Sequence, residues 1–256
     1  RKELEARANP RVSFRGHSDT EVMLAAIETW GLENAVRRFV GMFAFALWDR
    51  QQHRLHLVRD RLGIKPLYYG WAGNTLLFGS ELRAFTAHPN FRGEIDRNAI
   101  ALLLRHSCIP APYSIYRGVY KLPPGMVLTL GGPEPSDTTP VAYWSAREVA
   151  EGGTREPFTG SEAEAIEQME TLLREAVSLR MIADVPIAAF LSGGLDSSTV
   201  VALMQAQSDR PIKTFTIGST DPGFDESRHA RAVSRHLGTD HTELIVTHDD
   251  ALAVVP

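Results

Sequence analysis

Residues 184–198 read DVPIAAFLSGGLDSS, an apolar run followed by two glycines and then by carboxyl and hydroxyl side chains. The run from 185 to 191 is nearly all apolar, which predicts a strand buried on both faces. Residues 197–207 predict a helix, so the glycines fall where the strand turns into that helix. Because open parallel sheets bind ligands at the carboxyl ends of their strands, this turn is the first candidate site.

The turn has the chemistry of a polyphosphate site. Gly193 and Gly194 allow backbone N–H groups to approach a ligand closely, and the helix amino terminus adds about half a positive charge. Asp196 fits as an oxygen ligand for Mg²⁺ held on the phosphate. Three hydroxyl groups can donate to phosphate oxygens: those of Ser192, Ser197 and Ser198. The segment contains no lysine, which excludes a Walker-type phosphate loop.

A purely structural role for this turn is the alternative to ligand binding. A strand, a glycine turn and a serine-capped helix often occur together without any ligand, and two glycines alone are weak evidence. The full order of strand, glycines, hydroxyls and acid is much rarer. We therefore predict that the turn binds a polyphosphate with Mg²⁺.

The rest of the second half alternates helices with strands. Ser161 and Glu164 form a predicted capping box ahead of an amphipathic helix. After the glycine turn, three further elements are expected: a strand over 212–217, a helix over 225–237 and a strand over 242–246. This alternation predicts a parallel, doubly wound α/β sheet.

The first half is rich in hairpins. A helix is expected over 19–30, and a second helix follows its capping residue Asp96. Paired apolar or alternating runs predict two antiparallel hairpins: 42–48 with 54–58, and 67–71 with 75–78. We expect an α+β domain over 1–158 and an α/β domain over 159–256, joined by a polar linker at 151–160.

Composition narrows the classes of partner and compartment. The 256 residues carry a net charge of −4 without a run of basic residues, which argues against nucleic acid. The single cysteine, Cys108, excludes an intramolecular disulfide, and its default role is that of a packed small hydrophobe. The nine histidines lack a metal-binding spacing. Without a signal peptide or a long apolar run, we expect a cytoplasmic protein that does not contact membranes.

The string at 184–198 resembles the pyrophosphatase loop of class B asparagine synthetases, which hydrolyse glutamine. Segments 224–227 and 237–241 resemble the next helix and strand of that family. The resemblance implies that Leu191 and Ile217 lie beside adenine and ribose and that Asp196 binds Mg²⁺. It places pyrophosphate on the loop formed by Ser192, Gly193, Gly194, Leu195, Asp196, Ser197 and Ser198.

The first half resembles the glutaminase domain of the same family through segments 18–21, 41–46 and 59–69. This implies an Ntn-type fold of antiparallel sheets layered with helices, in which Asp19 binds the α-amino group of glutamine. The alternative is that Asp19 only caps the helix that it precedes. We expect four charged residues of the third segment to form surface ion pairs without a catalytic role: Arg59, Asp60, Arg61 and Lys65.

The sequence departs from this family at its amino end. The family's nucleophile is an amino-terminal cysteine whose own amine acts as the base, whereas this sequence begins with Arg1 and Cys108 lies mid-chain. The family's Asn-Gly-Glu motif and the arginine that binds the glutamine carboxylate would lie upstream. Its aspartate-binding segments would follow Pro256. We therefore expect a fragment shortened at both ends, with no catalytic residue and no activity of its own.

The resemblance implies glutamine-dependent asparagine synthesis, in which ATP adenylates aspartate and ammonia from glutamine displaces AMP. Glutamine, aspartate and ATP would be the substrates, and AMP and pyrophosphate would be released. Two alternatives stay open. A relative such as a β-lactam synthetase would keep the ATP loop with a different acceptor, and an inactive nucleotide-binding scaffold would keep only the fold. The apolar faces also leave room for a homodimer.

Overall fold

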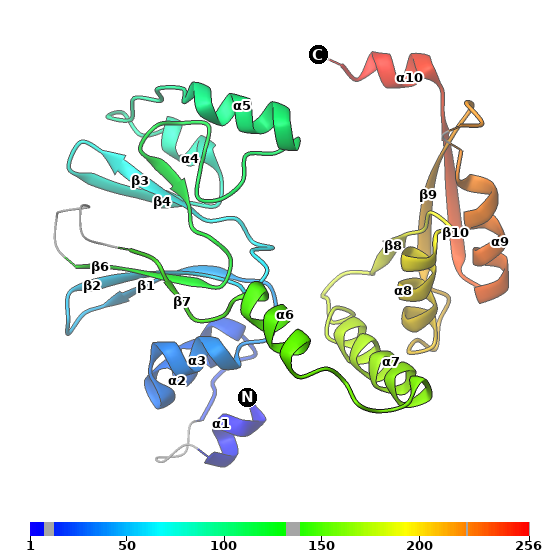
Figure 1. The fold of residues 1–256 in the computed structure, drawn as a ribbon, viewed down its shortest axis with the longest axis horizontal. Helices are drawn as coiled ribbons and strands as arrows, with labels where there is room; N and C mark the ends of the chain where they lie inside the picture. Colours follow the sequence, from blue (N-terminus) through cyan, green and yellow to red (C-terminus); the bar gives the residue numbers. More distant parts are fainter. Residues whose placement is uncertain (8–12, 132–138, 224, 256) are drawn as a thin grey trace. The chain divides into compact units, whose positions relative to one another are not determined.

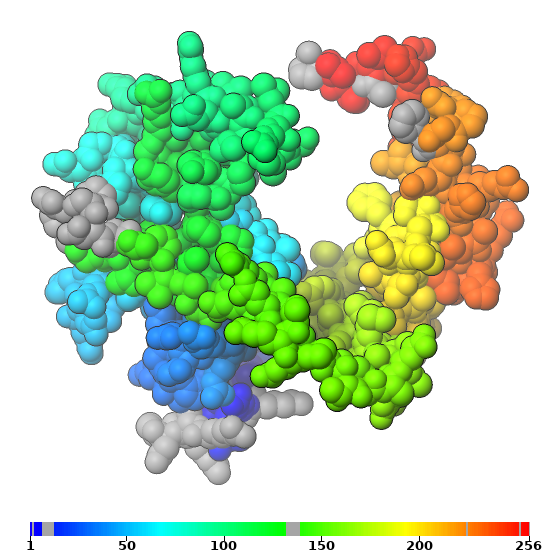
Figure 2. All heavy atoms as spheres, in the orientation of Figure 1, coloured from blue at the N-terminus to red at the C-terminus, as the bar shows by residue number. Residues whose placement is uncertain are grey.

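The computed structural model describes residues 1–7, 13–131, 139–223 and 225–255 (Figure 1). The chain divides into two compact units, Arg1–Pro157 and Phe158–Pro256. Figure 2 draws both units with all atoms as spheres, coloured along the sequence. Within the described ranges, no helix is long and apolar enough to cross a membrane.

The first unit contains two antiparallel sheets, with strand orders β1-β2-β6-β7 and β4-β3-β5. Its strands are β1 (Ala44–Asp49), β2 (Arg54–Arg59), β3 (Tyr68–Ala72), β4 (Thr75–Gly79), β5 (Val119–Lys121), β6 (Met126–Gly131) and β7 (Val141–Ala142). Its helices are α1 (Lys2–Arg7), α2 (Asp19–Trp30), α3 (Leu32–Arg38), α4 (Leu82–Thr86), α5 (Arg97–His106) and α6 (Ala146–Arg155). Both predicted hairpins are confirmed, because β1 pairs with β2 and β3 pairs with β4 in antiparallel register.

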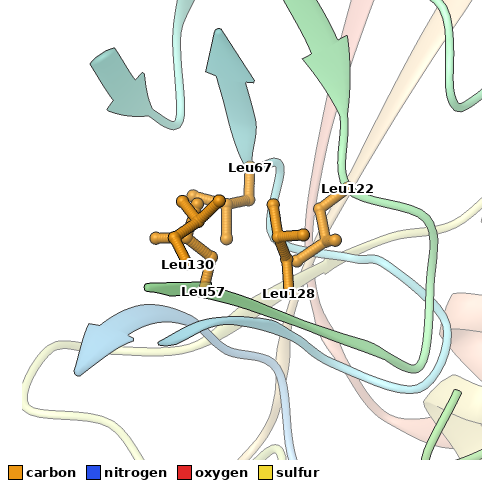
Figure 3. Close-up of a cluster of buried hydrophobic side chains, with 5 residues drawn as sticks. All are labelled: Leu57, Leu67, Leu122, Leu128 and Leu130. Carbon is orange, nitrogen blue, oxygen red and sulfur yellow. The ribbon is translucent and has the colours of Figure 1, made fainter. Parts of the chain in front are cut away.

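A layer of leucines joins the two sheets of this unit. Figure 3 shows the five side chains that form it: Leu57, Leu67, Leu122, Leu128 and Leu130. Because side chains alternate along a strand, the neighbour of Leu57, Val58, points to the opposite face of the first sheet. There it packs with Val36 of α3. Figure 1 shows α4 and α5 beyond the second sheet, so the layers run helices, sheet, sheet, helices.

The first half of the polar stretch expected to be a linker is helical. Residues 151–155 belong to α6, so the linker predicted over 151–160 is wrong for that part. The helix begins after Ser145, whose Oγ accepts a hydrogen bond from the backbone N–H of Glu148 at 3.3 Å. Two glycines in its last turns weaken the helical pattern, which is why the sequence suggested a linker.

The second unit contains one parallel sheet in the order β10-β9-β8. Its strands are β8 (Ala188–Phe190), β9 (Lys213–Ser219) and β10 (Asp240–Val246). Its helices are α7 (Glu162–Ser178), α8 (Leu195–Gln205), α9 (Ser227–Leu237) and α10 (His248–Ala253). The capping box of Ser161 and Glu164 is confirmed. The predicted strand over 185–191 is too long, because only β8 pairs with β9.

The two faces of this sheet differ in burial. On β9, Thr214 and Thr216 are at most 4% exposed, whereas the alternating Phe215 and Ile217 are 39% and 61% exposed. Leu244 of β10 pairs in register with Ile217 and is 60% exposed. Among the described residues, the sheet therefore has one packed face and one bare apolar face. The reversal of strand order that defines a doubly wound sheet stays a prediction.

Candidate functional site

The glycine turn of the second unit connects β8 directly to α8. The helix begins at Leu195, earlier than the predicted start at 197, so Asp196 and the two following serines lie in its first turn. Gly194 occupies the N-cap position, and no side chain caps this end of the helix. The uncapped amide groups of a first helical turn attract anions, because they carry partial positive charge and lack intrahelical partners.

The three serines of the turn differ in their hydrogen bonding. The hydroxyl groups of Ser192 and Ser197 lie 2.8 Å apart, and the backbone N–H of Gly194 donates to Ser192 Oγ at 3.3 Å. Ser198 Oγ is buried and has no hydrogen-bond partner among the described residues. A buried hydroxyl without a partner is unfavourable, so this group destabilises the turn as it stands.

Gly193 is required at its position for two reasons. Its φ is +81°, a backbone conformation that residues with a side chain rarely adopt. A Cβ atom there would lie 2.6 Å from both the backbone nitrogen of Ala230 and the Cβ of His229. The amino-terminal part of α9 therefore lies directly against the turn. Gly194 is less constrained, since its Cβ would meet only Ser192 Oγ, at 3.4 Å.

The two residues expected beside adenine and ribose, Leu191 and Ile217, differ in burial. Leu191 is 1% exposed and packs in a core with Val201 and Ala230. Its backbone N–H donates to the carbonyl of Phe215 at 2.9 Å, and its carbonyl accepts from Thr216 Oγ1. The Leu191 side chain is therefore part of the core, and its backbone anchors the turn to the sheet; its place beside the nucleotide stays a prediction.

Ile217, in contrast, lies open at the end of β9. It lines a cavity of ≈ 410 Å³, together with residues from the end of β10. The cavity wall is formed by Ile217, Gly218, Ser219, Thr220, Asp221, Val246, Thr247 and His248. Of the segment that resembles the next helix, Phe224 lies outside the described residues, and Asp225 accepts a bond from the backbone N–H of Ser227 at 3.1 Å.

Asp196 is exposed in the first turn of α8. Its carboxylate forms no hydrogen bond or ion pair with another residue in the described part of the chain. That part also contains no group of three His, Cys, Asp or Glu side chains able to hold a metal ion. A single carboxylate fits Mg²⁺ that arrives bound to phosphate, because Mg²⁺ is commonly held by one or two carboxylates plus substrate oxygens.

The first unit contains a cavity of ≈ 380 Å³ between α2 and β1. Asp19 lies on its wall, together with Lys65 and Ser80, neither of which was a predicted site residue. The remaining lining residues are Thr20, Met23, Leu24, Ile27, Met42, Phe43, Ala44, Phe45, Ala46 and Leu47. The resemblance of segments 18–21, 41–46 and 59–69 marked most of these lining residues, whereas nothing in the sequence marked Ser80.

Asp19 does not cap the helix, so that alternative is wrong. The helix begins at Asp19 itself, and Ser18 occupies the N-cap position without a capping bond. Among the described residues, the Asp19 carboxylate accepts only from the neighbouring backbone N–H of Thr20, at 2.8 Å. Its remaining lone pairs are available to a cationic group in the cavity.

The cluster around Arg59 and Asp60 contains a buried carboxylate and a partly buried guanidinium rather than surface ion pairs, which corrects the sequence-based expectation; Lys65 alone of the four residues is exposed. Asp60 is 1% exposed and accepts backbone N–H bonds from Ile64 and Lys65 at 3.0 and 2.9 Å. The Arg59 guanidinium donates to three backbone carbonyls, including that of Lys65 at 2.9 Å. Burial lowers the pKa of Arg59, and the nearby Asp60 charge opposes that shift.

Tyr143 completes this buried cluster. Its hydroxyl donates to the carbonyl of Arg59 at 2.9 Å, and burial raises the pKa of Tyr143 to about 12. Cys108, expected to be a packed hydrophobe, is exposed instead, because it lies in the loop after Ser107, which leaves α5 in the left-handed conformation. Cys108 does not line the cavity that contains Asp19.

Two protein families match the chain. The family described as "Glutamine amidotransferase domain" matches residues 1–144. The family described as "Asparagine synthase" matches residues 168–256. The first match covers the unit that contains the Asp19 cavity, and the second covers the glycine turn.

Curated relatives match over nearly the whole chain. It is 36% identical to a putative glutamine-hydrolyzing asparagine synthetase 2 of Methanocaldococcus jannaschii, over 93% of this chain and 45% of the relative. It is 31% identical to glutamine-hydrolyzing asparagine synthetase 3 of Bacillus subtilis, over 98% of this chain and 41% of the relative. It is 32% identical to "Amidase chry2" of Gibberella zeae, over 93% of this chain and 36% of the relative. The chain spans less than half the length of these relatives.

Proposed function

Since this chain belongs to the family of glutamine-hydrolysing asparagine synthetases, we propose that it takes part in the ATP-dependent synthesis of asparagine. In this reaction the aspartate carboxylate attacks ATP, forming an acyl-adenylate and releasing pyrophosphate. Ammonia from glutamine then displaces AMP and forms the amide. The observation that carries this proposal is the uncapped amino terminus of α8 behind the Ser192–Gly193–Gly194 turn, at the carboxyl end of a parallel strand.

The turn and the start of α8 would hold the triphosphate. Backbone N–H groups of Gly193 and Leu195 can donate to phosphate oxygens, and Ser198 lies in the same first turn of α8. Ser192 and Ser197 hold each other's hydroxyl groups near the same place. The exposed Ile217 would lie against the base or the ribose. Leu191 acts indirectly, by anchoring the turn to β9.

Asp196 would hold Mg²⁺ together with phosphate oxygens of the nucleotide. When bound, the ion neutralises charge that grows on the leaving pyrophosphate. The carboxylate suits this role because no described residue already engages it. The aligned amide groups of the first helical turn contribute in the same direction, since they are oriented before the reaction starts.

The cavity of the first unit would bind glutamine. The Asp19 carboxylate would accept from the α-amino group, as a charge-assisted hydrogen bond. The four layers of this unit support an Ntn-type glutaminase fold. The bare apolar face of the parallel sheet supports a doubly wound sheet, because such sheets carry helices on both faces.

The second candidate function is an ATP-dependent amide-forming reaction with a substrate other than aspartate. The relative named "Amidase chry2" matches 93% of this chain, so the ATP loop occurs in proteins that are not named asparagine synthetases. A β-lactam synthetase-like reaction would use the same adenylation with another nucleophile. Chromatography of the products separates these candidates, because only the proposed reaction makes asparagine in amounts equal to the pyrophosphate released.

The test of the nucleotide site is Asp196→Asn in the protein expressed from its complete coding sequence. We expect pyrophosphate release that depends on aspartate to fall by about 100-fold, which corresponds to roughly 3 kcal/mol of transition-state stabilisation. Asp209→Asn is the matched control, because Asp209 is an exposed aspartate beyond the other end of α8. An unchanged rate in Asp196→Asn would refute the metal role.

A further inference from the structure

Asp60 is a buried carboxylate that the proposed chemistry leaves without a role. It follows β2 directly and is 1% exposed. Burial of a charge is unfavourable unless hydrogen bonds compensate it. Here they do, since Oδ1 accepts from the N–H of Ile64 at 3.0 Å and Oδ2 accepts from those of Lys65 and Phe43 at 2.9 and 3.3 Å. All three donors are backbone groups.

These donors come from two different walls of the cavity that contains Asp19. Phe43 leads into β1, and Lys65 lies in the turn between β2 and β3; both line the cavity, whereas Asp60 does not. One oxygen, Asp60 Oδ2, is shared by the two walls. The link is reinforced because the backbone N–H of Asp60 also donates to the carbonyl of Phe43 at 2.9 Å.

The turn that carries Lys65 is held from its other side as well. Arg59 Nε donates to the carbonyl of Lys65 at 2.9 Å, so both polar backbone groups of that residue are engaged. Gly63, in the same turn, has a φ of +66°, and a Cβ atom there would lie 2.8 Å from Pro124 Cγ. The turn therefore has little freedom to move while the Asp60 bonds are in place.

We propose that Asp60 is a positioning residue for glutamine binding, which fixes the width of the cavity through the backbones of Phe43 and Lys65. It does not touch the substrate. This inference rests on the proposed function, because it assumes that the cavity binds glutamine. It predicts an effect confined to the glutamine-dependent reaction, since ammonia supplied from solution does not need this cavity.

The test compares Asp60→Asn with wild type in the protein expressed from its complete coding sequence, with either glutamine or ammonium as the nitrogen source. The substitution keeps the side-chain size but replaces one acceptor oxygen with an NH₂ group, which cannot accept from the backbone N–H groups. We expect the KM for glutamine to rise about tenfold with a smaller change in kcat. The substitution moves the cavity walls that carry Phe43 and Lys65 but alters no group that reacts. Ammonium-dependent synthesis should stay within about twofold of wild type.

Asp49→Asn is the matched control. Asp49 Oδ1 accepts from the backbone N–H groups of Gln51 and Gln52 at 2.8 and 2.9 Å, in the turn between β1 and β2. The chemical change is the same as in Asp60→Asn, but Asp49 lies outside the cavity lining. This variant should therefore leave the KM for glutamine unchanged.

Gly63→Ala tests the same turn without altering the carboxylate and decides the question if Asp60→Asn does not fold. It should raise the KM for glutamine and spare the ammonium reaction. A normal KM for glutamine in the folded variants, or an equal loss of both reactions, would overturn the positioning role while leaving the proposed function intact. A wild-type protein that uses ammonium but never glutamine would overturn the glutamine assignment and this inference together.

Discussion

The glycine turn of the second unit comes from one continuous stretch, residues 192–198, whereas the cavity of the first unit is lined by α2, β1, the turn after β2 and Ser80. In the turn, the residues that carry the chemistry are neighbours in the sequence, and their order reflects the order of strand, bend and helix. In the cavity, they meet only after two antiparallel pairs and a helix have packed. A continuous site can thus be recognised from spacing, and an assembled one cannot.

The carboxylates of the two sites also differ. Asp196 is exposed and engages no described residue, which suits a group that waits for a ligand. Asp60 is 1% exposed and its oxygens are occupied by backbone N–H groups, which suits a group that holds the protein together. Burial and hydrogen bonding therefore separate two aspartates that look alike in sequence.

The largest effect should follow from Gly193→Ala, which breaks the continuous site. The new Cβ would lie 2.6 Å from the backbone of α9, at a φ of +81°. We expect the second unit to lose on the order of 4 kcal/mol of folding free energy. Aspartate-dependent pyrophosphate release should become undetectable, because the turn that donates to phosphate would move.

Gly238→Ala is the control for this substitution. Gly238 also has a positive φ, of +71°, and lies in the same unit, but a Cβ atom there meets nothing within 4 Å. It should cost only about 1 kcal/mol and leave pyrophosphate release intact. If Gly193→Ala and Gly238→Ala behave alike, the close approach of α9 to the turn is not what constrains the site.

A smaller effect is expected from Leu57→Ala, which tests the packing of the first unit, where the Asp19 cavity lies. Leu57 is 0% exposed in the leucine layer, so its truncation should cost about 3 kcal/mol. All four tryptophans lie in the first unit, so their fluorescence in urea reports its unfolding separately from that of the second. We expect the fluorescence midpoint to fall.

Leu244→Ala removes the same side chain from the bare face of the parallel sheet. Because Leu244 is 60% exposed, this variant should shift unfolding by less than about 1 kcal/mol. Circular dichroism follows it, since the second unit contains no tryptophan. A large destabilisation by Leu244→Ala would show that this face is covered in solution.

Local signals in the sequence were sufficient for most elements. The alternation that gives β1 and β2 and the capping box before α7 each depend on nearby residues, and each is confirmed. The roles of Asp60 and Leu191 could not be predicted this way. Both depend on contacts with distant segments, and a charged residue beside a turn or a leucine beside a glycine loop gives no sign of what covers it.

The helix α6 escaped prediction for a different reason. Its sequence combines glycines and charges, which disfavour a buried helix, and none of its residues is buried. An exposed helix of this kind depends on its cap and on pairs one turn apart, such as Arg147 with Glu151. These weak local terms are hard to distinguish from those of a polar linker.

The smallest predicted effect concerns acid, which should weaken the two units at different pH. Burial lowers the pKa of His56 in the first unit below its usual 6.5. The unfolded chain therefore takes up this proton before the folded unit does, and stability falls as pH drops below about 6.5 until the folded pKa is passed. In the second unit, the bond from Arg231 lowers the pKa of Glu243, so its contribution is lost only as pH falls through that lowered value, below 4.5. His56→Asn should remove the drop in the urea midpoint, followed by tryptophan fluorescence, between pH 7.5 and 5.5. His106 is exposed, so the control variant His106→Asn should retain the drop. An equal drop in both variants would exclude the buried imidazole as its cause.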